Sequence, residues 1–380
     1  MNLSAVSKKP KIIWLNVLFF SVTFVIAAIA VPIYAYFVGF EKSTIIATII
    51  GICFCELSIT AGYHRLWSHK SYESSKIIRF IYAIGGAFAV QNSALHWSSD
   101  HRIHHRHVDN NDKDPYSAKN GFWYSHIGWM LREYQIHRYH DYDNVRDLQK
   151  DPIIVWQHKY YWTLALITNI TIPVLFGLIT NQLLASILLL GIFRLAVSHH
   201  LTFFINSLAH IWGNQPYNDK NTAKDNPIIA WLTFGEGYHN FHHVFQYDYR
   251  NAIKWWQFDP TKWLIKTLNI LGLAKNLKKT PENKIIKAIA QQQLNYMKKN
   301  LSTISAVNQN ELINSIQQEY EQLIVNMNYF YKMKKEWLAI IKNDLSNNMD
   351  KNHLSIKYKE LQTKWSEQQL HWQGIMRQYA

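Results

Sequence analysis

The stretch S-T-I-I-A-T-I-I-G-I-C-F-C-E-L-S-I-T-A-G-Y-H-R-L-W-S-H, residues 43–69, joins a long apolar run to two closely spaced histidines. Residues 43–63 contain one charged side chain, Glu56, and about 20 apolar residues suffice for one helix to cross a bilayer. His64 and His69 follow where such a helix would leave the membrane. Clustered imidazoles are typical metal ligands. The stretch therefore predicts a membrane helix that ends in metal-binding histidines.

Three more apolar runs complete a membrane domain of two helical hairpins. The four spans that we predict are residues 12–40, 43–63, 160–180 and 182–207. The turns between the members of each hairpin contain a single lysine, whereas nearly all other Lys and Arg residues lie on the opposite side. Basic residues concentrate on the cytosolic side of a membrane. We therefore expect both termini and the histidines on the cytosolic face, in a bacterial inner membrane by preference or else in an endoplasmic reticulum membrane.

The apolar run 77–95 is not expected to cross the membrane. It separates His64 and His69 from the next histidine group, at residues 101–105, and both groups must reach one site. Two crossings would be needed, and about 19 residues are too few for two. We predict an interfacial helix whose Gly85-Gly86 pair allows close approach of a neighbour.

The composition excludes some partners and separates two domains. The 380 residues carry a formal net charge of +14, which the bias toward basic cytosolic segments largely explains. No recognised nucleic-acid module is present, so we expect no nucleic-acid partner. The two cysteines, Cys53 and Cys55, lie inside an apolar run and are expected to pack there.

Residues 1–279 are predicted to form the membrane domain, and residues 280–380 a helical extension of unknown role. In the extension, apolar residues recur at spacings of three and four, which is typical of long amphipathic helices; they include Leu312, Ile316, Tyr320, Leu323, Met327, Phe330 and Trp337. A self-packed hairpin or small bundle, a docking platform for a redox partner and a dimerising coiled coil are all compatible with this pattern.

Nine histidines are the candidate metal ligands. They are His64, His69, His101, His104, His105, His210, His239, His242 and His243. Spacings of three and four place the members of the groups 101–105 and 239–243 on one helical face each. Asn206 shares a face with His210, and the spacing of five between His64 and His69 suits a helix end where the chain unwinds.

Nine imidazoles are too many for one ion and suit two. Zinc usually takes four ligands, with cysteine common among them in structural sites. A histidine-rich pair of iron ions fits better, because oxygen chemistry needs a redox metal with open positions. The neighbouring His96, His107, His199 and His200 are secondary candidates that could support the ligands. Arg194, inside the fourth span, could face a functional group or pair with a residue such as Glu56.

The text around these histidines resembles that of the membrane fatty acid desaturases. H-R-L-W-S-H, H-R-I-H-H and G-E-G-Y-H-N-F-H-H match the three histidine boxes of that family, and the detailed text is similar to its acyl-CoA Δ9 (stearoyl-CoA) branch. Matching segments include D-P-Y-S-A at 114–118, N-S-L-A-H-I-W-G-N-Q-P-Y at 206–217 and D-Y-R-N-A-I-K-W-W-Q-F-D-P-T-K-W at 248–263. The resemblance covers about residues 12–279.

The resemblance implies an O2-dependent conversion of a saturated acyl chain of 16–18 carbons into a cis-Δ9 monoene. It also implies that the nine histidines hold two irons, with Asn206 bound to one of them through water. Electrons would come from a separate cytochrome b5-like or ferredoxin-type donor with its reductase, because neither signature occurs in this chain. A related membrane hydroxylase is the alternative reaction.

The same resemblance implies which residues bind the substrate, a long-chain acyl-CoA. Gln91, Trp97 and Thr202 match the bend of the family's acyl tunnel, and Asn92 matches a residue near the thioester. Arg132 matches a region that contacts the CoA phosphates. Ser99, however, stands where many acyl-CoA members have arginine. Acyl carrier protein or a glycerolipid therefore stays open as the acyl carrier.

Overall fold

The computed structural model describes residues 10–135, 140–302, 309–343 and 348–379. The chain divides into two compact units. One comprises residues 1–215 and 220–279, and the other residues 216–219 and 280–380. The sequence predicted both termini on the cytosolic face, but residues 1–9 and 380 lie outside the described residues.

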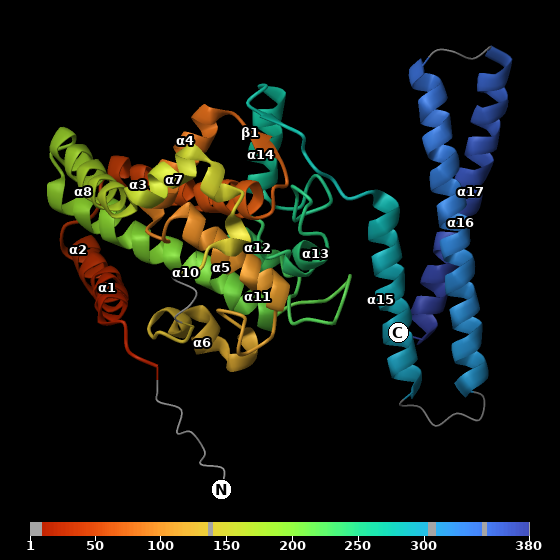
Figure 1. The fold of residues 1–380 in the computed structure, drawn as a ribbon, viewed down its shortest axis with the longest axis horizontal. Coiled ribbons are helices and arrows are strands. Elements are labelled where there is room, and N and C mark those ends of the chain that lie inside the picture. Colours follow the sequence, from red (N-terminus) through yellow and green to blue (C-terminus); the bar gives the residue numbers. More distant parts are fainter. Residues whose placement is uncertain (1–9, 136–139, 303–308, 344–347, 380) are drawn as a thin grey trace, which may run out of the picture. The chain divides into compact units, whose positions relative to one another are not determined.

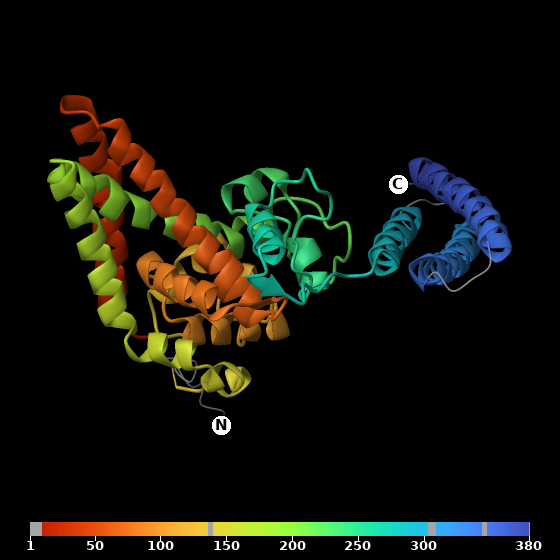
Figure 2. The same cartoon turned by 90° about the horizontal axis from the view of Figure 1, so that it is seen from above.

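Four helices in the first unit are long and apolar enough to cross a membrane, which confirms the predicted all-α integral membrane fold (Figures 1 and 2). They run over Trp14–Phe37, Lys42–Ser68, Tyr161–Ile179 and Leu183–Ile211. The fourth span contacts the other three. The second and fourth spans extend beyond the predicted ends at 63 and 207, and the extra turns carry histidines of the candidate site.

Several spans consist of more than one helical segment. The first comprises α1 (Trp14–Val25), η1 (Ile26–Ala30) and α2 (Val31–Phe37); the second α3 (Lys42–Leu57) and η2 (Ser58–Ser68); the third α8 (Tyr161–Ile179); the fourth α9 (Leu183–Ser186), η8 (Ile187–Phe193), α10 (Arg194–Asn206) and α11 (Leu208–Ile211). The segments η1, η2 and η8 are π-helical. π-helical turns are rare and occur frequently at functional sites.

Helix α4 (Lys76–Ala89) is too short to cross the membrane and packs on η2 and α8. A Cβ atom added at Gly85 would lie 2.0 Å from the Ser58 hydroxyl oxygen, and one at Gly86 would lie 2.2 Å from the Tyr63 ring. Both glycines therefore allow the close approach that the sequence predicted. Ile77 and Phe80 are exposed on the other face of α4.

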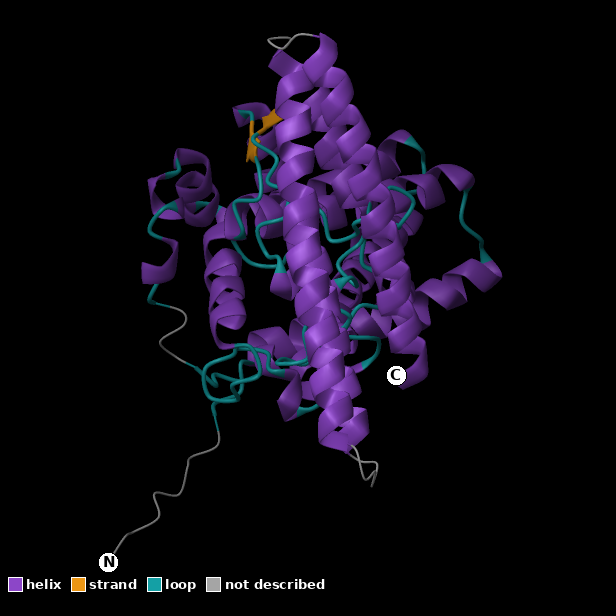
Figure 3. Ribbon diagram, turned by 90° about the vertical axis from the view of Figure 1, so that its right-hand side faces the viewer, coloured by secondary structure: helices purple, strands orange, loops and turns teal. Residues whose placement is uncertain are grey.

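The rest of the first unit is a cap of short elements around the histidines. Its helices are α5 (Ala94–His107), α6 (Phe122–His126), α7 (Pro152–Lys159), α12 (Pro227–Leu232), α13 (His239–Val244) and α14 (Pro260–Ile270), with 3₁₀ turns η3 (Ala118–Asn120), η4 (Gly128–Met130), η6 (Asp143–Val145) and η7 (Leu148–Lys150). In the part of the chain that the structure describes, the strands are β1 (Glu73–Ser74) and β2 (Ala274–Lys275), which pair antiparallel (Figure 3). This pairing ties the end of the cap to the turn after the first histidine pair.

The second unit contains three long helices, α15 (Glu282–Ser302), α16 (Gln309–Asn343) and α17 (Asn348–Tyr379). They share a core of their own, whose buried residues include Leu294, Met297, Leu323, Met327 and Trp365. The apolar spacing of the extension is accounted for by this packing among the three helices.

Candidate metal centre

The nine histidines gather into two groups, with the ligand atoms of each group within 4.8 Å of one another. The first group is His64, His69, His101, His105 and His242, and the second is His104, His210, His239 and His243. Each group draws on separate parts of the chain, so the fold alone brings its members together. Neither group contains a cysteine or a carboxylate.

Three local structures aim the side chains. Helix α5 presents His101, His104 and His105 from adjacent turns, and α13 presents the group 239–243 in the same way. His69 lies beside His64 because the turn between them is π-helical. The backbone N–H of His69 donates to the His64 carbonyl, five residues earlier, at 3.1 Å. The helix does end at this point, as expected, but its π-helical winding is what sets the two rings side by side.

Within each group the Nε2 atoms face one another. The Nε2 atoms of His69 and His101 are 2.8 Å apart, and that of His242 is 3.0 Å from those of both His64 and His105. In the second group the separations are 3.0 Å for His239–His243, 3.1 Å for His210–His239 and 3.3 Å for His104–His243.

These separations fit ligands of a shared ion. Nitrogen ligands about 2.1 Å from one ion and at right angles to each other lie ~3.0 Å apart, whereas tetrahedral ligands lie ~3.4 Å apart. Most of the observed values match the right-angle geometry of a centre with more than four positions. The donor set therefore fits two metal ions, one in each histidine group.

The opposite ring nitrogens are held from outside the site. Nδ1 of His104 lies 2.9 Å from the Asp114 carboxylate, and Nδ1 of His64 lies 2.9 Å from Glu236. Nδ1 of His210 lies 2.8 Å from the Thr222 hydroxyl. Such partners place the proton on Nδ1 and leave Nε2 free for a metal.

The electrostatics of the site favour neutral ligands and fixed counter-charges. Burial, and then the neighbouring imidazoles, hold the pKa of His242 and His243 well below the usual range of histidine. Burial alone would raise the pKa of Glu236, but His64 and Arg65 outweigh it and lower that pKa to about 2. Glu236 is therefore ionised at physiological pH, and its negative charge compensates cations bound beside it.

A small cavity of about 20 Å³ lies between the two groups. Its lining includes His64 and His101 from the first group, His104 and His239 from the second, and also Asn206. One water needs roughly 10–15 Å³, so the cavity has the volume for a water beside Asn206.

Two of the predicted tunnel residues line the same cavity. Trp97 stacks on the His101 ring at 4.9 Å between centroids, and Thr202 faces the cavity from α10. Gln91 donates from Nε2 to the Thr202 hydroxyl at 2.8 Å. The structure thus brings Thr202 of α10 to the edge of the metal centre, next to Gln91 and Trp97, which lie more than 100 residues earlier in the sequence.

The remaining substrate candidates take other positions. The backbone N–H of Asn92 donates to the Tyr161 hydroxyl at 2.8 Å. The Oδ1 atom of Asn92 accepts a hydrogen bond from the Ser93 N–H at 2.8 Å. Arg132 donates to the Pro10 carbonyl at 2.9 Å, which holds the chain that enters the first span. Neither residue lines the cavity between the histidine groups.

The secondary candidates His96, His107, His199 and His200 join neither histidine group. The interpretation of Arg194 as a partner of Glu56 is wrong: among the described residues its guanidinium donates to Asn169 at 2.5 Å and to the Phe88 carbonyl at 2.8 Å. It also lies 3.6 Å from the centroid of the Phe88 ring. A neutral amide, a carbonyl and an aromatic face satisfy it in place of a carboxylate.

Comparison with known proteins places this site in a family. Residues 43–269, which include all nine histidines, match the family model described as fatty acid desaturase. This chain belongs to the fatty acid desaturase family. The match begins at the second span and ends in α14, so the three helices of the extension lie outside it.

Three relatives of this desaturase differ in origin and coverage. This chain is 47% identical over 250 residues to acyl-CoA desaturase 1 of Saccharomyces cerevisiae, and the match covers 66% of this chain and 49% of the relative. A probable acyl-CoA desaturase of Schizosaccharomyces pombe is 44% identical over 253 residues, covering 66% and 52%. The sn-2 palmitoyl-lipid 9-desaturase of a Nostoc species is 33% identical over 277 residues, covering 72% and 92%. The chain thus spans about half the length of its two fungal relatives.

Glu236 and Asp114 are site residues that sequence reasoning missed. Both lie in segments that match the desaturase text, G-E-G-Y-H-N-F-H-H and D-P-Y-S-A, yet only the histidines of the first segment were assigned a role. The available signal was a carboxylate within about ten residues of a group of histidine ligands, since metal-bound histidines usually pair with a carboxylate or carbonyl.

Asp114→Asn is expected to weaken metal binding by the second histidine group. The amide keeps the shape of the side chain but removes the negative charge beside Nδ1 of His104, and the loss of such a partner typically costs 10- to 100-fold in metal affinity. Metal titration of the purified apoprotein measures the change. Asp112→Asn, an exposed position two residues away, is the control, and equal affinities for the two variants would contradict the role of Asp114.

Proposed function

We propose that this desaturase introduces a cis-Δ9 double bond into a saturated acyl-CoA of 16–18 carbons, with O2 as co-substrate and electrons from a separate protein. The observation that carries the proposal is the position of Trp97 and Thr202, which lie beside both histidine groups. Because an alkyl chain has no polar group near the reacting carbons, walls fixed beside the metal centre must position it.

Two iron ions are the proposed cofactor. The first would be held by His64, His69, His101, His105 and His242, and the second by His104, His210, His239, His243 and, through water, Asn206. Bound there, a redox-active iron pair would supply the activation of O2 that C–H bond cleavage requires.

The protein's own part in the reaction is positioning and exclusion of water. Trp97, stacked on the His101 ring, and Thr202, fixed by Gln91, form the wall against which the acyl chain would bend. Glu236 and Asp114 hold the protons on Nδ1 of His64 and His104 and keep their Nε2 atoms directed at the metals. Asn92 and Arg132 are proposed contacts nearer the thioester and the CoA.

The carrier and the cellular setting belong to the same proposal. The names of the two fungal relatives support CoA, whereas that of the Nostoc relative, which is covered over most of its length, supports a glycerolipid as the second candidate. The net charge of +14 suits an acidic electron donor of the cytochrome b5 or ferredoxin type. We place the metal centre on the cytosolic face of a bacterial inner membrane, or alternatively of the endoplasmic reticulum.

Expression in a host that is auxotrophic for unsaturated fatty acids tests the reaction. The chain is expected to restore growth without supplement, and gas chromatography with mass spectrometry of the total lipids is expected to show a cis-Δ9 monoene. A hydroxy acid as the main product would replace desaturation by hydroxylation. A double bond at another carbon would keep the reaction and overturn the regiochemistry.

A further inference from the structure

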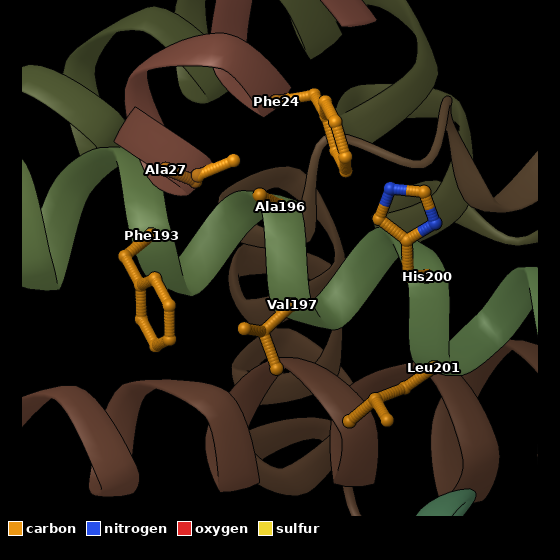
Figure 4. Close-up of a pocket in the computed structure, with 8 residues that line it drawn as sticks. Phe24, Ala27, Phe193, Ala196, Val197, His200 and Leu201 are labelled. Atoms are coloured by element: carbon orange, nitrogen blue, oxygen red, sulfur yellow. The ribbon is translucent and has the colours of Figure 1, made fainter. Parts of the chain in front are cut away.

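A larger cavity than the one at the metal centre lies between the first and fourth spans. It consists of two adjoining grooves of about 270 and 330 Å³ that share Phe24, Ala196 and His200 in their linings. Together the two grooves reach the size that small-molecule sites typically have, roughly 300 Å³ and upward. Figure 4 shows Phe24 and Ala27 of the first span facing Ala196 and His200 of the fourth.

The fourth span separates these grooves from the metal centre. Ala196, His200 and Phe203 line the grooves, whereas Thr202 and Asn206 of the same span line the cavity at the metals. The groove residues therefore have no place in the proposed reaction. A ligand bound there would be a second molecule and not the substrate.

The position of the grooves along the fourth span matches one leaflet of a bilayer. Phe193 and His200 lie 10 and 17 residues after Leu183. At the α-helical rise of 1.5 Å per residue they lie at most about 15 and 26 Å from the outer end of the span, because the π-helical segment η8 is shorter per residue. The hydrocarbon core is about 30 Å thick. The grooves thus run from the bilayer centre toward its inner surface, in a lining that is almost entirely apolar.

The polar end of the grooves is a hydrogen-bond acceptor. The Ser207 hydroxyl donates to the Phe203 carbonyl at 2.8 Å, so its oxygen accepts the contact of 3.0 Å from Nδ1 of His126. Burial, and then the neighbouring His200, lower the pKa of His126 to about 4, so this ring is neutral and its Nε2 is unprotonated. That Nε2 lies 2.9 Å from Nδ1 of His200, which must donate to it.

The proton on Nδ1 of His200 leaves its Nε2 as a lone pair. A neutral imidazole has one donor and one acceptor nitrogen, and Nε2 of His200 has no hydrogen-bond partner among the described residues. An ionised carboxylate or phosphate has only acceptor atoms, so it would be repelled by the lone pair of this nitrogen. A hydroxyl would instead donate to it.

We propose that the grooves bind one monoacylglycerol, with its acyl chain along Phe24 and Phe193 and a glycerol hydroxyl donating to Nε2 of His200. The chain then runs toward the bilayer centre and the glycerol lies at the inner surface, in the orientation of any lipid of that leaflet. The inference does not depend on the proposed desaturation, because every group that it uses lies outside the metal centre.

Photocrosslinking in nanodiscs tests the proposal. The purified protein is labelled with a monoacylglycerol that carries a diazirine in its acyl chain, and mass spectrometry maps the labelled peptides. We expect labels next to Phe24 and Ala196. Unlabelled monoacylglycerol is expected to compete about five- to tenfold better than its dimethyl ether, because the ether cannot donate the hydrogen bond. Equal competition by the ether, or stronger competition by the fatty acid anion, would overturn the assignment.

Three variants separate the groove from general contact with lipid. Ala196→Trp fills the groove and is expected to reduce labelling at least tenfold, whereas Leu166→Trp, on the exposed lipid-facing side of α8, is expected to leave it unchanged. His200→Phe keeps the ring and removes the acceptor, so alcohol and ether should compete equally. Elution as a single species and full metal content show that each variant is folded. Unchanged labelling of the folded Ala196→Trp protein would contradict the proposal.

Discussion

His104→Ala is expected to abolish the proposed desaturation while leaving the membrane domain folded. His104 supplies one of the four imidazoles of the second histidine group, and its Nε2 lies 3.3 Å from that of His243. Loss of an outer partner alone typically costs 10- to 100-fold, so we expect loss of a ligand to lower product formation by more than about 100-fold. Lipid analysis of the expression host measures the product, and metal analysis of the purified protein should show about half of the bound metal.

His107→Ala is the matched control for this variant. The residue lies on the same helix, three positions away, but belongs to neither histidine group. Its metal content and activity are expected to equal those of the unmodified chain. Full activity of the His104 variant would rule out the second group as part of the catalytic centre.

Arg65→Met is expected to cause the largest loss of stability. The Arg65 side chain is fully buried and donates to Glu236 at 2.8 Å, to Asp259 at 3.1 Å and to the Tyr249 carbonyl at 2.9 Å. Its replacement leaves two carboxylates buried without their cation, and breaking a buried pair in this way costs about 3–5 kcal/mol. Thermal unfolding followed by size-exclusion chromatography should show a Tm lower by roughly 10 °C.

Lys70→Met tests whether this loss comes from burial. Lys70 also forms an ion pair, at 2.9 Å with Asp147, but its side chain is 53% exposed. Exposed pairs contribute about 0–1 kcal/mol, so the Tm of this variant should stay within a few degrees of the unmodified value. Similar losses for the two variants would contradict the importance of the buried network around Glu236.

The sequence predicted the elements of this fold that depend only on short patterns of residues. The four spans follow from the apolar runs, and the shared face of His101, His104 and His105 follows from their spacing on one helix. The exclusion of residues 77–95 as a span followed from the need to bring two histidine groups to one site. Each of these predictions needed only chain length, helix geometry and the thickness of a bilayer.

The partners that buried groups find across the fold were not predictable. Arg194 pairs with Asn169, 25 residues away, and with the backbone of Phe88, because the crossing of three helices decides which acceptors come within reach. Glu236 reaches His64 across 172 residues of sequence. Such contacts depend on tertiary packing, which periodicity does not encode.

The π-helical winding of the second span makes its length critical. Segment η2 (Ser58–Ser68) is buried throughout and ends immediately before His69. Removal of one residue from it would let ordinary α-helical hydrogen bonds form, but it would also turn His69 by about 100° relative to the residues before the deletion. Substitutions within this segment can therefore be tolerated where volume is kept, whereas single-residue insertions and deletions cannot. The outer turn near Gly39, where an added Cβ would meet no atom within 4 Å, is the place where this hairpin can change in length.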